Sequence, residues 1–370
     1  MIITDVECIM LRLPEVLPIG DSTQDTLIVK VHTDEGIVGI GECHTSPWIL
    51  KAVIEAPVSA HASRGLKEIV VGQNPLSIGS LWDRMYELSM VYGRRGLIIQ
   101  AMSAIDMALW DILGKVCGQP VHQLLGGSRR DDIPAYASTL AAPDIKSAIR
   151  EVQELVDQGF RAIKFGWGNL GKDLKSDLQF VEKMREAAGT EVDLMVDVGM
   201  PMPIRDAKQL AQGLAALGVF FLEEPLSPDD LDGYAALVGA SPLPIACGEK
   251  ETTRFGFRDL IERGQVDIIQ PDVARAGGFT ECRRIADMAD LHGTQVIPHC
   301  WSTDILVSAT LNFIATLSDC PYLEFCVVDN PIRRSVIQEP IEVVDGMVSI
   351  PNRPGLGLEL NDKIVEDLRY

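Results

Sequence analysis

The sequence VDLMVD, at residues 192–197, is a short apolar run that ends in a carboxylate. The same pattern returns as VFFLE at residues 219–223 and as LPIACGE at residues 243–249. Helical patterns separate the runs, so this unit is typical of alternating strands and helices. The intervals between the terminal acids are both 26 residues, and these acids are Asp197, Glu223 and Glu249.

These three acids are the first candidates for a functional site. In a barrel built from such units, the carboxyl ends of the parallel strands converge on one face, so the carboxylates would lie close together. Like charges at short distance raise each other's pKa values unless a divalent cation that prefers oxygen ligands lies among them. A single acid at a strand end is commonly a solvated loop residue. Three at one interval favour a site for Mg²⁺, which Mn²⁺ could replace.

The chain divides into an N-terminal α+β part and a repeating strand-helix part. Alternating patterns at residues 1–13 and 25–43 predict an antiparallel meander, and helical patterns follow, the clearest at residues 97–116. From residue 132 onward, eight units predict a (β/α)₈ barrel, whose last helix could be truncated or replaced. The expected strands are residues 133–138, 160–165, 192–197, 219–223, 243–247, 266–270, 294–297 and 322–325.

We therefore predict an α/β fold in which a capping domain covers one end of a TIM-type barrel. The expected divisions are an α+β cap at residues 1–125, a barrel at residues 126–325, and a segment at residues 326–370 that returns to the cap. The active site of such a barrel lies at the carboxyl ends of its strands.

Composition disfavours several classes of function. The 370 residues carry a net charge of −20, which repels nucleic-acid phosphates and anionic lipids. We find no signal-peptide pattern and no apolar run of about 18 residues, so we expect a cytoplasmic protein without a membrane partner. Eight scattered cysteines form no Cys-x-x-Cys pair, which disfavours a zinc module or a disulfide framework. We expect a homo-oligomer that acts on a small carboxylate.

Motifs along nearly the whole chain match a known pattern. They are AIDMALWDILGK at 104–115, residues 120–127 and 159–164, EEP at 223–225, GE at 248–249 and QPD at 270–272. On these motifs the chain resembles the enolase superfamily, and within it the mandelate racemase subgroup. The resemblance implies that Asp197, Glu223 and Glu249 bind Mg²⁺, which takes the substrate carboxylate. Removal of the α-proton then gives an enediolate whose charge the metal stabilises.

His299 and Asp272 are the candidate base and its orienting partner. They follow the seventh and sixth expected strands, so Asp272 could hold one imidazole nitrogen while the other faces the substrate. Their interval of 27 residues matches the His-Asp dyad of the family. Glu324, at the eighth strand, matches the acid that in relatives contacts the substrate carboxylate opposite the metal. To donate a hydrogen bond it would have to be protonated; the alternative is a solvated strand end.

The second strand departs from the family pattern. Relatives that use a lysine base carry Lys-x-Lys there, whereas this chain has Lys164 and then Gly166 where the second lysine belongs. Lys164 is expected to pair with the substrate carboxylate and to act mainly through its charge. The face opposite His299 is left without a base. Racemisation is therefore disfavoured, because it needs a proton acceptor on each face.

Elimination at the β-carbon needs only one base, so we predict the Mg²⁺-dependent dehydration of a sugar acid. With a ring oxygen as the leaving group, the same first step would open a sugar-acid lactone or an anhydro sugar acid, as a cycloisomerase does. The sequence does not separate these two reactions. A racemase or epimerase is the next alternative. A barrel that binds without turnover is disfavoured, because it would need neither a base nor its orienting partner.

Selection among substrates is expected from the capping domain. Its loops at residues 14–24 and 42–48 would fold over the barrel mouth, together with residues 92–95. The polar candidates for contacts with a hydroxylated substrate are Asp21, Gln24, His44, Arg94 and Arg95. From the barrel, Trp167 is a further candidate for a substrate contact.

Overall fold

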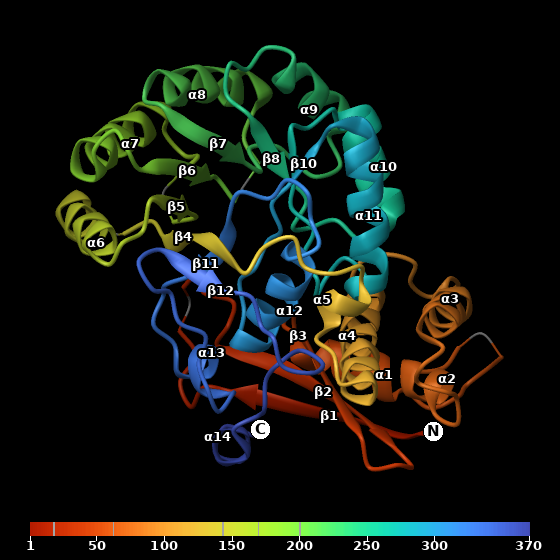
Figure 1. Ribbon diagram of the computed structural model, residues 1–370. Coiled ribbons are helices and arrows are strands. Elements are labelled where there is room, and N and C mark those ends of the chain that lie inside the picture. Colours follow the sequence, from red (N-terminus) through yellow and green to blue (C-terminus); the bar gives the residue numbers. More distant parts are fainter. Residues whose placement is uncertain (18, 62, 143, 169, 200) are drawn as a thin grey trace.

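The structure is a computed structural model that describes residues 1–370 except 18, 62, 143, 169 and 200. Position 18, in the loop predicted at residues 14–24, therefore lies outside the described residues. The predicted meander is confirmed as a three-stranded antiparallel sheet in the cap, at the bottom of Figure 1. Its strands are β1 (Ile3–Arg12), β2 (Asp25–Thr33) and β3 (Val38–Cys43).

Helix α4 (Leu97–Cys117) is the central helix of the cap. It packs so closely on β3 that a Cβ atom on Gly39 would lie 2.0 Å from the carbonyl oxygen of Ala108. The smaller cap helices are α1 (Pro47–Glu55), α2 (Leu66–Val70), α3 (Ile78–Ser89) and α5 (Val121–Leu124).

Helix α4 corrects the expectation that the chain has no long apolar run. It is long and apolar enough to cross a membrane, although Asp106 and Asp111 interrupt the run. Within the protein, 78% of its apolar window is buried, so α4 is a core helix of the cap.

All eight predicted barrel strands are present. They form one parallel sheet in the order β10-β9-β8-β7-β6-β5-β4-β11, above the cap in Figure 1. Parallel strands in this order bring their carboxyl ends to one side. The strands are β4 (Asp132–Leu140), β5 (Ala162–Gly166), β6 (Asp193–Asp197), β7 (Val219–Glu223), β8 (Ile245–Cys247), β9 (Ile268–Ile269), β10 (Gln295–Val296) and β11 (Leu323–Cys326).

Helices cover the outside of this sheet. Several begin at an Asp or Thr whose side chain accepts from backbone N–H groups of the first turn, as Asp144 does for α6. After β11 only the five-residue α13 (Pro331–Ser335) follows, so the last barrel helix is replaced, as expected. The others are α6 (Ile145–Asp157), α7 (Leu174–Ala188), α8 (Ile204–Ala216), α9 (Leu231–Val238), α10 (Thr253–Asp259) with the π-helical η1 (Leu260–Gly264), α11 (Gly278–His292) and α12 (Asp304–Ile314).

The wall of the barrel has one seam without a ladder. Strand β11 pairs with β4, but within the described residues no ladder joins β11 to β10. A side chain bridges the seam instead: the backbone N–H of Cys300, just after β10, donates to Oε2 of Glu324 in β11 at 2.8 Å.

The C-terminal segment returns to the cap (Figure 1). Strand β12 (Met347–Ser349) first pairs antiparallel with β4, and α14 (Asp362–Asp367) then leads to the cap sheet. The N–H of Tyr370 donates to the carbonyl of Met10 at 3.0 Å.

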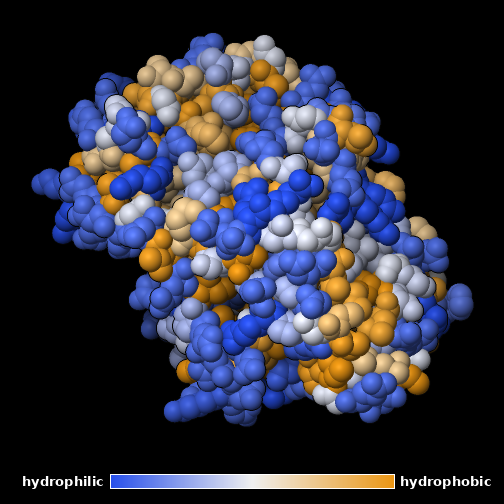
Figure 2. Space-filling view, in the orientation of Figure 1, coloured by the Kyte–Doolittle hydropathy of each residue, from blue (hydrophilic) through white to orange (hydrophobic). Residues whose placement is uncertain are grey.

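Buried groups also join the cap to the barrel. Asp106 of α4 accepts from the N–H and the hydroxyl of Thr280 in α11, at 3.0 and 2.6 Å. The indole N–H of Trp82 donates to the carbonyl of Gly277 at 2.8 Å. Hydrophilic side chains cover most of the face shown in Figure 2, and apolar side chains gather at its lower right, over the cap helices.

Candidate active site

A cavity of about 500 Å³ lies between the cap and the carboxyl ends of the barrel strands. The cap contributes Gly20, Ser22, Asp25, His44, Thr45, Ser46 and Gln100 to its lining. The predicted barrel residues in the lining are Lys164, Trp167, Asp197, Glu249, His299 and Glu324. Glu223 and Asp272 lie behind this lining and are fully buried.

The three predicted metal ligands are buried at the ends of β6, β7 and β8. Burial, and then the charge of Glu223, raise the pKa of Asp197 well above its usual value. Among the residues that the structure describes, no three acid, histidine or cysteine side chains already form a ligand cluster. The reason is that Glu223 contacts Lys164 and Glu249 contacts His299.

The donor set nevertheless fits a divalent cation. All three groups are carboxylates, which are the oxygen ligands that Mg²⁺ prefers. The raised pKa of Asp197 has the cause that a cation would remove, namely a like charge beside it in a buried site.

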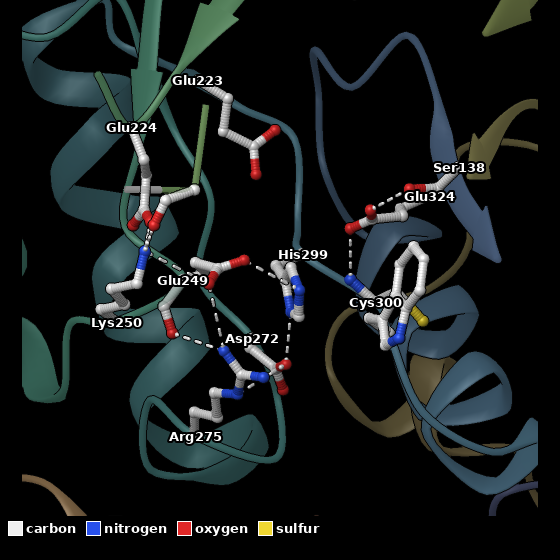
Figure 3. Close-up of polar contacts among 12 residues, drawn as sticks. Ser138, Glu223, Glu224, Glu249, Lys250, Asp272, Arg275, His299, Cys300 and Glu324 are labelled. Atoms are coloured by element: carbon white, nitrogen blue, oxygen red, sulfur yellow. Dashed lines mark hydrogen bonds and ion pairs between the residues drawn. The ribbon is translucent and has the colours of Figure 1, made fainter. Parts of the chain in front are cut away.

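His299 lies between two carboxylates, as Figure 3 shows. Its Nδ1 is 2.7 Å from Oδ2 of Asp272, and its Nε2 is 3.1 Å from Oε2 of Glu249. Burial lowers the pKa of His299, but Glu249 and then Glu324 outweigh burial and raise this pKa to about 10. The structure thus brings the predicted dyad together, with Nε2 paired to a predicted metal ligand.

Glu324 is an acceptor on both oxygens. Its Oε1 accepts from the hydroxyl of Ser138 at 2.7 Å and lies 2.7 Å from Nζ of Lys164, and its Oε2 accepts from the N–H of Cys300. Burial raises the pKa of Glu324, but Lys164 and then His299 outweigh burial and hold this pKa below its usual value. A protonated Glu324 that donates is therefore not what the structure contains. The alternative of a solvated strand end is also wrong, because Glu324 is fully buried.

Lys164 is held by two acids. Besides Glu324, its Nζ lies 2.9 Å from Oε2 of Glu223, and the side chain is buried. Two residues later, a Cβ atom on Gly166 would lie 3.0 Å from Oδ2 of Asp197, tighter than nearly all real contacts. The strand therefore offers a cation at position 164 and little room for a side chain at position 166.

The cap predictions have mixed outcomes. His44 lines the cavity, and its Nε2 lies 3.4 Å from Oδ2 of Asp272. The expectation for Arg94 is wrong in this structure, because its side chain is exposed and is not in the cavity lining. Arg95 lies over the ring of Phe255 instead of in the lining.

Two other cap candidates hold the loop together and do not line the cavity. Asp21 accepts from Arg333 at 2.8 Å and from Asn330 at 2.9 Å, so it ties the loop to the segment after β11. Gln24 donates to the carbonyl of Leu17 at 2.7 Å. Their polar atoms are satisfied internally, which is why they do not reach a substrate.

Sequence reasoning missed three charged residues beside the site. Lys250 forms an ion pair with the buried Glu224, and Arg275 lies 3.6 Å from both Glu249 and Asp272 (Figure 3). Glu224 and Lys250 directly follow two predicted metal ligands and repeat their interval. That shared interval was the available signal.

Two family models match most of the chain. Residues 2–126 match the N-terminal domain of the mandelate racemase and muconate lactonizing enzyme family, and residues 147–364 match the enolase C-terminal domain-like family. The chain belongs to the mandelate racemase subgroup of the enolase superfamily. Enzymes of this superfamily use Mg²⁺ and act on small carboxylates, and the likeness covers both parts of the fold.

Relatives within the mandelate racemase subgroup include two kinds of enzyme. The chain is 35% identical over 355 residues to the D-galactarolactone cycloisomerase of Agrobacterium fabrum, covering 93% of this chain and 91% of that protein. It is 33% identical to the L-rhamnonate dehydratase of Saccharopolyspora erythraea, covering 93% of this chain and 85% of that protein.

Solved structures of the subgroup agree with this fold. The 3,6-anhydro-D-galactonate cycloisomerase of Zobellia galactanivorans has a TM-score of 0.91 and 32% identity, and all of both chains is covered. A racemase of Streptomyces coelicolor with bound magnesium has a TM-score of 0.88 and 28% identity, again over all of both chains.

Proposed function

We propose that this protein is a Mg²⁺-dependent acid-sugar dehydratase in which His299 removes the α-proton of the substrate. The observation that carries the proposal is the dyad, in which Asp272 engages Nδ1 at 2.7 Å and leaves Nε2 for chemistry. Position 166, where relatives with a second base have lysine, is glycine. One base suits elimination and does not suit exchange on both faces.

The site supplies positive charge where the enediolate forms. Asp197, Glu223 and Glu249 would hold Mg²⁺, which supplies electrophilic stabilisation of the substrate carboxylate when bound. Lys164 adds a fixed cation beside Glu223 and Glu324. Charge placed before the reaction stabilises the developing anion without reorganisation during the step.

The proton and the electrons then move as follows. Nε2 of His299 accepts the α-proton once Glu249 is engaged as a ligand, and the electrons of the C–H bond enter the enediolate. The C–O bond at the β-carbon breaks, and His299 returns the proton to the departing oxygen, so water leaves. Asp272 orients the ring and stabilises its cationic form between these two events. The remaining enol converts to a 2-keto-3-deoxy acid.

Ring opening by a cycloisomerase is the second candidate. It shares the first step, and the similarity to two cycloisomerases, of D-galactarolactone and of 3,6-anhydro-D-galactonate, specifically favours it. In that reaction the β-oxygen belongs to a ring and stays attached to the product. Dehydration therefore removes one water from the mass of the substrate, whereas ring opening leaves the mass unchanged.

That difference provides the test. The Mg²⁺-loaded protein is incubated in D₂O with L-rhamnonate, arabinonate, D-galactarolactone and 3,6-anhydro-D-galactonate, and products are identified by mass spectrometry. We expect turnover and α-deuterium incorporation in the wild type and a loss of both of about 10³-fold or more in His299→Asn. Wild-type exchange in His299→Asn would show that another group is the base.

Further properties belong to the same proposal. We take Mn²⁺ as a substitute metal, the cap, barrel and returning segment as divided at residues 125 and 325, and a homo-oligomer as the assembly. Trp167 and His44 are proposed substrate contacts because both line the cavity. A cytoplasmic location is supported by the eight cysteines, which are all free thiols.

A further inference from the structure

The cap places a second histidine on the carboxylate of the dyad. His44 follows β3, is 2% exposed, and directs Nε2 at Oδ2 of Asp272, 3.4 Å away. The same Oδ2 accepts from Nδ1 of His299 at 2.7 Å. The other oxygen of Asp272 accepts from the N–H of Ala274 at 2.7 Å, so it is already engaged. The two histidines therefore share one oxygen atom.

The chemistry of Asp272 determines which nitrogen of His44 carries hydrogen. Burial raises the pKa of Asp272, but hydrogen bonds from His299 and His44 outweigh burial and hold this pKa far below its usual value. An ionised carboxylate only accepts, so Nε2 of His44 must donate. Burial, and then Arg275, lower the pKa of His44, so the ring is neutral. Its Nδ1 is buried and has no hydrogen-bond partner among the described residues.

The same cap segment also holds the barrel loop that follows His299. Glu42, two residues before His44, accepts from the hydroxyls of Ser302 and Thr303 at 2.7 and 2.9 Å. It also accepts from the N–H of Leu306 at 3.1 Å. The stretch around residues 42–44 thus contacts His299's partner on one side and His299's own loop on the other.

We propose that His44 is a positioning residue for the His299 base, acting through the oxygen of Asp272 that both rings share. The inference rests on the proposed function in taking His299 as the base. Without His44, the nearest other donor to that oxygen is Nε of Arg275, at 3.6 Å. The carboxylate would turn toward Arg275, and His299 would lose its fixed orientation. The cap then contributes to proton transfer as well as to the choice of substrate.

A matched pair of variants isolates the shared hydrogen bond. In His44→Gln the amide nitrogen can occupy the place of Nε2 and donate to Asp272. In His44→Asn the shorter amide reaches only the place of Nδ1, so the donor is lost while a polar group of similar size remains. We expect His44→Asn to slow α-deuterium incorporation about tenfold, as for residues that orient a catalytic group. His44→Gln should recover most of the rate, and KM should stay within about twofold in both.

A second readout needs no substrate. In the Mg²⁺-loaded protein, proton and nitrogen NMR report the Nδ1–H that His299 donates to Asp272, and its signal is assigned by its loss in His299→Asn. The chain has six histidines, which keeps the spectrum simple. This signal should move in His44→Asn and return close to its wild-type position in His44→Gln.

The two readouts separate this inference from the proposed function. An unmoved signal in His44→Asn, or equal displacement in both variants, would overturn the positioning role. A raised KM with unchanged kcat would assign His44 to substrate contact instead. Full α-proton exchange in His299→Asn would overturn the proposed function, whatever the NMR signal of the His44 variants does.

Discussion

The ammonium nitrogen of Lys164 lies 2.7 Å from Oε1 of Glu324, so the second and eighth barrel strands are joined by a buried ion pair. Because the same nitrogen lies 2.9 Å from Glu223, one cation serves a proposed metal ligand and a proposed substrate-anchoring acid. A lysine held by two carboxylates acts through its charge. Its replacement should therefore affect both turnover and folding.

Lys164→Met should lower turnover by about 10²- to 10³-fold, the usual loss when one preorganised electrostatic group is removed. Lys164→Arg keeps the charge and should retain part of the activity. The Met variant should also lose about 3–5 kcal/mol of unfolding free energy, because two buried carboxylates lose their partner. Steady-state kinetics and urea unfolding measure the two effects. Near wild-type turnover in the Met variant would contradict an electrostatic role.

Removal of the metal should abolish activity, and Glu223→Gln should weaken Mg²⁺ binding by at least about tenfold, because a charged ligand becomes neutral. Calorimetric titration of Mg²⁺ measures this without a substrate, and circular dichroism checks the fold. The matched control is Glu359→Gln, an exposed acid whose replacement should leave Mg²⁺ binding unchanged. Full turnover in excess chelator would exclude the proposed three-acid site.

Only one α-epimer of a substrate pair should exchange its proton, because no side chain stands opposite His299 on β5. Assays of both epimers in D₂O, in wild type and in His299→Asn, measure this directly. Exchange of both epimers, one of them surviving the loss of His299, would reveal a second base and favour a racemase or epimerase.

The close contact at position 166 gives a separate prediction. In Gly166→Ala the new Cβ would lie 3.0 Å from Oδ2 of Asp197, so the carboxylate must shift by a few tenths of an ångström. We expect weaker Mg²⁺ binding in this variant by calorimetry, with exchange still limited to the face of His299. Unchanged Mg²⁺ affinity would show that Asp197 moves freely or is not a ligand.

Asp106 should make stability depend on pH. Burial raises its pKa to about 7, hydrogen bonds from Thr280 oppose this, and Glu281 and Arg284 add smaller opposing effects. Because the folded pKa lies above the unfolded value of 3.8, the folded state binds the proton more tightly, and stability falls as pH rises from about 4 to about 7. Asp106→Asn should reduce this fall, as measured by thermal unfolding at pH 5 and pH 8. An unchanged difference between the two pH values would contradict the assignment.

Periodic signals made the barrel and its acids predictable. The interval of 26 residues locates Asp197, Glu223 and Glu249 at successive strand ends, and the dyad follows from strand order. The motif around Asp106 also has a structural explanation, because a Cβ atom on Gly278 would lie 2.3 Å from its carboxylate. Close packing of the cap helix on the barrel requires both residues.

The cap loops were not predictable because loop side chains have distant partners. Asp21 is engaged by Arg333, which lies 312 residues later in the chain. No local pattern reports such a contact, so a polar loop residue looks the same whether it faces a substrate or another segment. The protonation of Glu324 was unpredictable for a similar reason, since Ser138 and the N–H of Cys300 come from other elements.

The bridge from Cys300 to Glu324 has a consequence for how this barrel can change. In most strand pairs of the wall, backbone groups hold neighbours together and side chains are free to vary. Here the seventh and eighth strands are linked through the very side chain that is proposed to anchor the substrate. A substitution at Glu324 therefore alters the architecture together with the chemistry, and new substrate preferences are more readily acquired through the cap loops.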